Sequence, residues 1–160
     1  MFPWVILDRN RSSGMSNVLR FVPEVAPGLI PEAEVTSSRL SAMLEAAYID
    51  HQMEDDGDLY VTDGVDFPLW VHLMPDQKLV KLFTYYPVDE QPEVDWVARV
   101  NEINSRVELP QFCYAQDAVW ATYWMTFAGG LNIRQFVRML RRFSSAVVQA
   151  DLVQDPAASA

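Results

Sequence analysis

Apolar and polar residues alternate from Asp58 to Pro87, and this pattern predicts three consecutive antiparallel strands. The first two are expected to join at Asp63-Gly64. Asp-Gly between alternating segments is typical of a two-residue type I′ hairpin, because that turn needs positive φ at both central positions. Met74–Gln77 is expected to form the second turn. The sequence therefore predicts a meander with strands at 58–62, 65–73 and 79–86.

Three segments instead place apolar residues at helical spacing. The first begins after Thr36 or Ser37, either of which can cap a helix N-terminus, and ends near Asp50. The second begins at Pro92, which suits a first helical turn. The third begins at Asn132, which together with Gln135 resembles a capping box. The apolar stripes are Leu40, Met43, Leu44 and Ala47; then Trp96, Val97, Val100, Ile103 and Val107; then Ile133, Phe136, Val137, Leu140, Phe143 and Val147.

Two further strands are expected at 111–114 and 118–127, separated by a short turn at 115–117. Taken in order, the elements read helix, three strands, helix, two strands, helix. Strands paired with neighbours in the chain and helices gathered on one face define an α+β fold with an antiparallel sheet. We expect an irregular N-terminal arm over 1–35, a single domain over 36–150 and a flexible tail over 151–160.

One feature of this sheet departs from the usual pattern of one apolar and one solvated face. Large apolar side chains also fall on its second face: Trp70, Met74, Trp120 and Trp124. Either a terminal arm or a helix of the same chain covers them, or they form an interface, since contiguous exposed apolar surface marks binding sites.

The composition narrows the possible partners. The 160 residues carry a net charge of −10, which argues against nucleic acid and anionic membranes. A single cysteine, Cys113, excludes an internal disulfide framework, and no segment is apolar for long enough to span a membrane, so we expect a soluble cytoplasmic protein. Residues 119–150 lack Asp and Glu and contain Arg134, Arg138, Arg141 and Arg142. These arginines form either a solvated helix face or a surface complementary to an acidic partner.

Catalytic and metal-binding patterns are missing from the sequence. Its two histidines, His51 and His72, have no Cys or His at ligand spacing. The acidic stretch 54–58 fails the calcium-loop pattern, which needs Asp first and Glu last. Cys113 is expected to be a buried, inert thiol in the middle of a strand. We therefore expect neither enzymatic activity nor a cofactor or metal.

Several short segments within 36–150 carry a family resemblance: Gly57–Tyr60, Val100–Asn104, Gly129–Leu131 and Phe143. With these segments the chain resembles the YbjN family, whose fold is like that of type III secretion chaperones. The resemblance implies a compact module that tends to dimerise, has no catalytic activity and carries a sensory or regulatory label.

The leading hypothesis is a non-enzymatic, homodimeric protein-binding module that serves as a regulatory or chaperone-like adaptor. Its expected contact residues are Trp70, Met74, Trp120 and Trp124, with Arg134, Arg138 and Arg141 orienting an acidic partner. An open sheet edge could also accept a client strand. The alternative is a ligand sensor with a pocket between the last helix and the sheet, bottomed by Tyr123 and Phe136.

Overall fold

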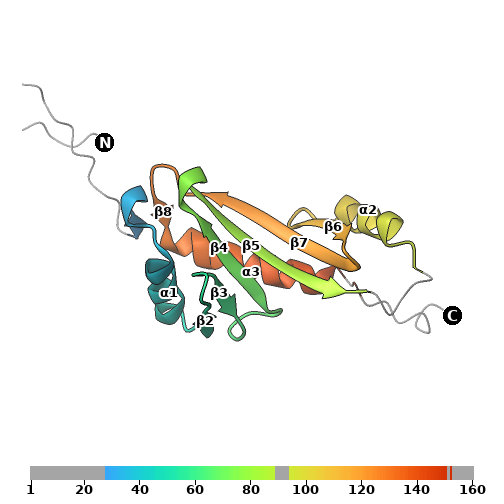
Figure 1. Cartoon of the computed structure of the whole chain (residues 1–160), viewed down its shortest axis with the longest axis horizontal. Coiled ribbons are helices and arrows are strands. Elements are labelled where there is room, and N and C mark those ends of the chain that lie inside the picture. The colour runs from blue at the N-terminus through green and yellow to red at the C-terminus, as the bar shows by residue number, and fades with distance from the viewer. Residues whose placement is uncertain (1–27, 89–93, 151, 153–160) are drawn as a thin grey trace, which may run out of the picture.

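The computed structural model describes residues 28–88, 94–150 and 152, and its main element is a six-stranded antiparallel sheet (Figure 1). The strand order is β2-β3-β4-β5-β7-β6, so β2 and β6 are the edges. A separate two-stranded sheet pairs β1 (Leu29–Ile30) with β8 (Leu131–Asn132). The strands of the large sheet are β2 (His51–Met53), β3 (Leu59–Val61), β4 (Leu69–Met74), β5 (Leu79–Pro87), β6 (Gln111–Ala115) and β7 (Ala118–Thr126).

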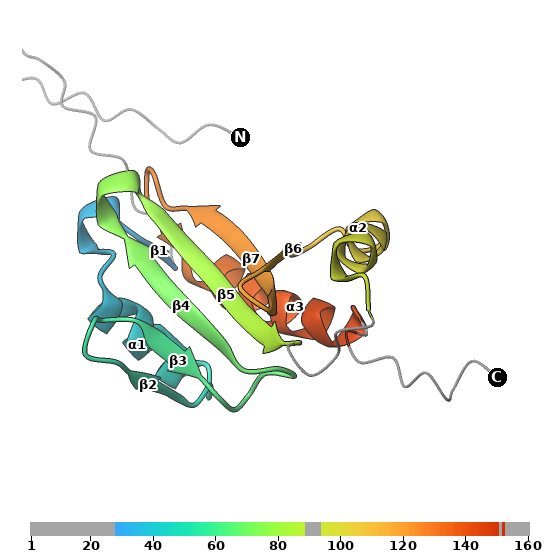
Figure 2. The same cartoon turned by 45° about the vertical axis from the view of Figure 1, so that its right-hand side comes forward.

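Three helices accompany the sheet: α1 (Ser37–Ala46), α2 (Trp96–Arg106) and α3 (Ile133–Gln149). Figure 2 shows α3 passing behind β5 and β7, while no described helix lies in front of β4 and β5. The α2 helix instead lies at the β6 end of the sheet, where it packs against that strand. The mixed α+β class and the expected order of helices and main strands are confirmed.

Strand alternation gives the large sheet one closed face. Every second side chain points toward α1 and α3 and joins one hydrophobic core with the helical stripes. Leu82 and Val80 on β5 and Phe136 and Leu140 on α3 are all fully buried. The core members from the sheet are Leu59, Val61, Leu69, Val71, Val80, Leu82, Phe112, Val119, Ala121 and Met125.

The helix N-termini follow the expected capping chemistry. The Thr36 hydroxyl accepts a hydrogen bond from the Arg39 N–H at 3.1 Å, and the Asn132 side chain accepts from the Gln135 N–H at 3.0 Å. Both predicted starts are confirmed, because these side chains satisfy backbone donors that have no partner in the helix. The prediction that Val97 is buried is wrong: it is 60% exposed, since α2 turns a narrower stripe, Trp96, Val100 and Ile103, toward the core.

The predicted Asp63-Gly64 hairpin is wrong. The strand β3 ends at Val61 and β4 begins at Leu69, so residues 62–68 form a longer connection. Of the two turn residues only Gly64 has positive φ, whereas a type I′ turn needs both.

The connection 62–68 is held by tertiary contacts that the local sequence does not show. A Cβ on Gly64 would lie 2.9 Å from the Tyr48 carbonyl oxygen, so the loop packs closely against the end of α1. The Phe67 N–H donates to Ser144 Oγ of α3 at 2.6 Å, and that hydroxyl donates to the Phe67 carbonyl at 3.0 Å. These contacts outweigh the local preference of Asp-Gly for a tight hairpin.

A two-residue hairpin does occur, at the short turn expected between β6 and β7. Gln116 and Asp117 both have a φ of +54°, in the left-handed region that a type I′ turn requires. Ala115 and Ala118 are paired on either side of the turn. The register of the β6–β7 pair therefore starts from this turn.

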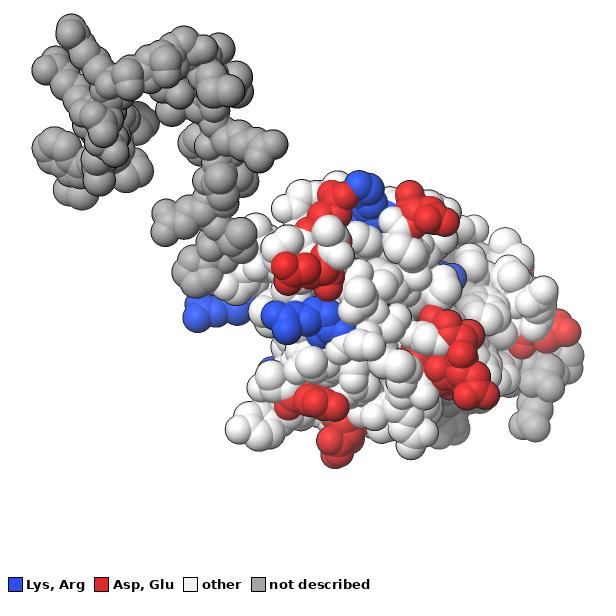
Figure 3. Space-filling model, turned by 60° about the vertical axis from the view of Figure 1, so that its left-hand side comes forward, with Lys and Arg blue, Asp and Glu red and all other residues white. Residues whose placement is uncertain are grey.

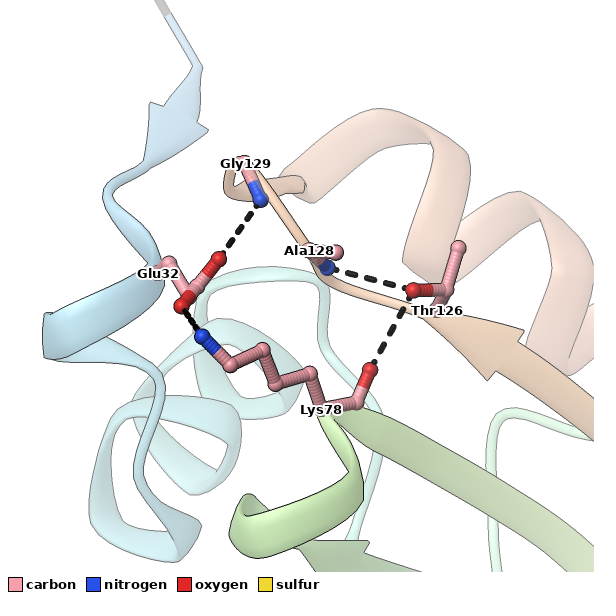
Figure 4. Close-up of polar contacts among 5 residues, drawn as sticks. All are labelled: Glu32, Lys78, Thr126, Ala128 and Gly129. Carbon is pink, nitrogen blue, oxygen red and sulfur yellow. Dashed lines mark hydrogen bonds and ion pairs between the residues drawn. The ribbon is translucent and has the colours of Figure 1, made fainter.

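The first described residues form regular elements, although the sequence predicted an irregular arm there. Residues 28–35 contain β1 and a one-turn 3-10 helix, Glu32–Glu34. The Glu32 carboxylate accepts from Lys78 Nζ and from the Gly129 N–H, which joins this helix to the β4–β5 turn and to the loop after β7 (Figure 4). Residues 1–27, 151 and 153–160 lie outside the described part, so the arm and tail predicted there stay predictions. Leu152, within the predicted tail, is buried in the hydrophobic core.

The edge strand β2 was also not predicted. Residues 51–57 were expected to form an acidic connection, yet His51–Met53 pairs with β3. Three residues are too few for alternation to be recognised, and pairing with β3 is a tertiary event.

Candidate functional site

Five aromatic rings form a continuous array on the face of the sheet opposite α3. Tyr60 and Trp70 have ring centroids 4.5 Å apart. Trp70 also stacks at 5.7 Å on Phe83 and at 5.6 Å on Tyr85. Tyr85 in turn lies 5.1 Å from Trp120. We call Tyr60, Trp70, Phe83, Tyr85 and Trp120 the aromatic ladder, and the side of the sheet that carries it the open face.

The register of the sheet builds this ladder from four adjacent strands. Tyr60 of β3 pairs with Trp70 of β4, Trp70 with Phe83 of β5, and Tyr85 of β5 with Trp120 of β7. Directly paired residues in an antiparallel sheet have their side chains on the same face and within contact distance. The ladder thus runs across the strands rather than along one of them.

A second aromatic group extends the open face toward the β4–β5 turn. Lys81 Nζ lies 4.7 Å from the Phe83 ring centroid and 5.2 Å from that of Trp124, which are cation–π distances. Trp124 is 44% exposed and Tyr85 is 42% exposed. Aromatic surface of this kind, covered by no described helix, is typical of a binding face.

The two ladder indoles have polar partners at their edges. Trp70 Nε1 donates to Glu54 Oε1 at 3.4 Å, and Trp120 Nε1 donates to the Ala115 carbonyl at 3.2 Å. Their N–H groups are therefore satisfied within the chain, and the parts of the rings that stacking leaves exposed are apolar.

Two hollows lie beside the aromatic groups. One of about 280 Å³ lies at the start of β4 and is lined by Trp70, Tyr85 and Pro68 among others. The other, of about 520 Å³, lies between Trp124 and the connection from α2 to β6, and Tyr123 lines it as well.

The structure places the expected aromatic residues together. Trp70, Trp120 and Trp124 lie on the open face, and Met74 lies at the end of β4 with the same facing as Trp70. The alternation of 79–86 also gives Phe83 and Tyr85 one facing, but the sequence analysis did not include them, and Tyr60 needed the β3–β4 register. The role of all these residues as an interface stays a prediction.

The arginines of α3 are not part of this face. Because α3 packs on the closed face, the sheet separates its side chains from the ladder. Arg134, Arg138 and Arg141 instead line an apolar hollow of about 440 Å³ with Ala47, the residue that follows α1, and Arg141 donates to the Ala47 carbonyl at 3.1 Å. A single partner surface combining both groups, as the sequence suggested, is not what the geometry offers.

One edge of the sheet is partly blocked. The Asn104 side chain of α2 donates to the Phe112 carbonyl and accepts from the Phe112 N–H, both at 2.9 Å. The side-chain amide thus takes the place of a neighbouring strand at Phe112, near the start of β6. The opposite edge, β2, is only three residues long. Both features limit pairing with a client strand.

Titratable groups do not converge on the ladder. His72 on the open face is bonded through Nδ1 to Asp58 Oδ1 at 2.5 Å. Loss of hydration, with a hydrogen bond to Asp117, raises the pKa of Tyr114 on β6. No group of His, Cys, Asp and Glu among the described residues could hold a metal ion.

The expected burial of Cys113 is wrong. Its side chain is exposed, because β6 is an edge strand and Cys113 pairs with Trp120, whose side chain points to the open face. In the described part of the chain, no helix has both the length and the apolar character to cross a membrane.

Charged side chains form separate groups on the molecular surface. On the side shown in Figure 3, several groups of Asp and Glu are divided by wide uncharged areas and a few basic side chains. Charge is therefore not spread evenly over this side of the described molecule.

Comparison with solved structures identifies the fold. The structure of YbjN from E. coli, titled a putative transcription regulator, has a TM-score of 0.60 at 16% identity and covers 72% of this chain and 87% of that one. An uncharacterized protein from Methanothermobacter thermautotrophicus has a TM-score of 0.53 at 12% identity, with 72% and 94% covered. No curated protein matches the sequence.

Residues 33–155 match one family over most of the chain. Its description is "TY-Chap1: T3SS (YopN, CesT) and YbjN peptide-binding chaperone 1". The match starts within the 3-10 helix before α1 and runs past the end of α3, so it contains the whole six-stranded sheet. The chain therefore belongs to this family of YbjN and type III secretion peptide-binding chaperones.

Proposed function

We propose that the chain is a non-enzymatic peptide-binding module and that its open face binds an extended segment of a client protein. The observation that carries this proposal is the aromatic ladder, which crosses four strands with no described helix above it. The family description, a peptide-binding chaperone, supports the same class of activity.

The chemistry of the face suits a peptide better than a small polar substrate. Tyr and Trp give large contact area at little entropic cost and dominate the energy of many protein interfaces. The indole N–H groups of Trp70 and Trp120 are already bonded within the chain. A ligand would therefore gain mainly apolar and stacking contacts, which tolerate many client sequences.

The test is a pair of substitutions on the open face. Trp120→Ser and Trp124→Ser together should weaken the binding of apolar peptides, selected from a random peptide library against the wild-type chain, by at least about tenfold, as for hot-spot residues. The matched control is Val97→Ser, since Val97 is exposed on α2 away from the ladder. Circular dichroism should show all variants folded. Unchanged peptide affinity in the double variant would refute the proposal.

The expected homodimer and adaptor role are part of this proposal. A dimer would present two open faces and bind two client segments. Light scattering at two protein concentrations and two salt concentrations tests the dimer. A molar mass of one chain under all these conditions would refute the dimer without contradicting the binding role.

The ligand-sensor alternative receives no support from the geometry. Phe136 is fully buried in the core, and Tyr123 lines a hollow with the α2–β6 connection rather than with α3.

A further inference from the structure

We infer that the client segment carries a Lys or Arg next to a short apolar stretch, with the basic side chain bound at the β2–β3 end of the ladder. This inference rests on the proposed function and specifies its ligand. It follows from the uneven distribution of charge around the open face.

Acidic side chains are concentrated at the β3 end of the ladder. The β2–β3 turn places Glu54, Asp55, Asp56 and Asp58 within five residues. The turn is closed by hydrogen bonds from the Glu54 N–H to the Asp58 carbonyl at 2.8 Å and from the Gly57 N–H to the Glu54 carbonyl at 3.0 Å. The carboxylates are therefore held close together by the backbone.

These carboxylates differ in their availability to a ligand. Asp58 is buried and bonded to His72. Glu54 is exposed, and its carboxylate contacts the indole N–H of Trp70, so negative charge lies directly beside the ladder. Asp55 and Asp56 are exposed next to it.

Basic charge within the strands of the large sheet lies on β5, beside the ladder rather than at its β3 end. Lys81 is the only Lys or Arg among the six strands of the large sheet, and its ammonium lies over Phe83 and Trp124. The open face thus has a negative end at β2–β3, while the basic residue of its strands lies on β5 opposite Trp124. A guanidinium or ammonium at the negative end would gain ion pairing with the exposed carboxylates and a cation–π contact with Tyr60, the end ring of the ladder.

The length of the ladder determines how many residues of the client segment lie across it. From Tyr60 on β3 to Trp120 on β7 the ladder crosses three inter-strand intervals, or about 15 Å at roughly 4.8 Å each. An extended segment of about five residues spans this length at roughly 3.3 Å per residue. Its alternate side chains would face the rings, and the basic residue would follow within one or two positions.

The experiment compares two designed peptides by isothermal titration calorimetry with the full chain at low salt. Both contain Trp and Leu at alternate positions over five residues; one ends in two arginines and the other in two glutamates at the same positions. We expect the arginine peptide to bind about tenfold more tightly, since exposed ion pairs contribute about 0.2–1 kcal/mol each.

Isosteric neutralisation locates the preference. Glu54→Gln with Asp55→Asn should reduce the preference for the arginine peptide to less than about threefold, because it removes two negative charges. The glutamine side chain at position 54 keeps an acceptor for the Trp70 N–H. The matched control, Glu34→Gln with Glu45→Gln, removes the same charge from exposed sites on the 3-10 helix and on α1 and should leave the preference unchanged.

The outcomes separate this inference from the proposed function. If both peptides bind equally and Trp120→Ser weakens both, the face binds peptides and the charge inference is wrong. Tighter binding of the glutamate peptide would overturn it in favour of Lys81. If neither peptide binds and the chain is a dimer that Trp120→Ser with Trp124→Ser dissociates, a second copy occupies the face and both proposals fail.

Discussion

The two faces of the large sheet are built from the same strands and differ in what covers them. On β5, Leu82 is fully buried beneath the helical layer, while its neighbour Phe83 belongs to the ladder on the open face. Val71 and Trp70 make the same contrast on β4. One residue along a strand thus separates a core side chain from a candidate ligand contact.

This contrast teaches that apolar character alone does not define a core. The apolar side chains of the closed face are removed from water by α3 and α1, and this burial stabilises the fold. The open face is apolar without such a layer, so its rings stabilise one another by stacking while their outer surfaces remain available. Substitutions on the two faces should therefore affect different measurements.

The largest expected effect is on the closed face. Leu82→Ala should lower the free energy of unfolding by about 2–5 kcal/mol, because it leaves a cavity in a close-packed core. Phe83→Ala should cost only about 1 kcal/mol, mainly its stacking on Trp70. Urea denaturation followed by circular dichroism measures both.

The variant that loses less stability should lose more peptide affinity. Phe83→Ala should weaken binding to the open face, whereas Leu82→Ala should leave it unchanged under conditions where the variant is folded. Equal loss of stability in both variants would break the comparison between the faces.

An intermediate loss of stability is expected on changing Asn104, which is bonded to the β6 edge. Asn104→Ala removes both hydrogen bonds to the Phe112 backbone and should destabilise the chain by about 1 kcal/mol. It should also free Phe112, near the start of β6, for strand pairing, and concentration-dependent association by sedimentation would show this. Asn101→Ala, on an exposed position of the same helix, is the control. Tighter peptide binding by Asn104→Ala would mean that clients use this edge as well as the open face.

The smallest expected effect on the free energy of unfolding concerns the contact of Glu32 with Lys78 and Gly129. The hydrogen bond from Lys78, followed by that from the Gly129 N–H, lowers the pKa of Glu32 below its ordinary value of 4.5. The folded state thus binds this proton less tightly than the unfolded state, so the stabilisation is present above pH 4.5 and is lost as the pH falls through the lowered pKa.

Glu32→Gln should therefore lower stability slightly at pH 7, and the difference from the wild-type chain should vanish in acid. Thermal unfolding between pH 7 and pH 3 checks this. A difference that persists unchanged at the lowest pH would show that the contact acts through shape rather than charge. Peptide affinity of the open face should not change.

Much of the fold could be predicted because its signals are local. Apolar spacing of 3.6 residues identified the helices, and Thr36 and Asn132 were recognised as caps because capping is decided within four residues. The strands 111–114 and 118–127 were long enough for their alternation to be read. Trp120 and Trp124 were assigned to the second face by the same alternation.

The errors occurred where distant segments decide the outcome. Asp63-Gly64 would favour a hairpin alone, but Ser144 and the end of α1 hold that loop in a longer path. The strand β2 exists only because β3 pairs with it, and Cys113 is exposed because β6 has no further strand beyond it.

The sequence by itself determined the class of the fold, the starts of α1 and α3 and the presence of spare aromatic residues, since periodicity and capping are properties of neighbouring residues. The predicted start of the second helix at Pro92 was wrong, because α2 begins at Trp96 after its N-cap Asp95. Only the tertiary structure decided that Tyr60, Trp70, Tyr85 and Trp120 stack into one ladder, because strand register sets which side chains meet. It also decided that the arginines of α3 lie on the far side of the sheet, because a helix can cover only one face.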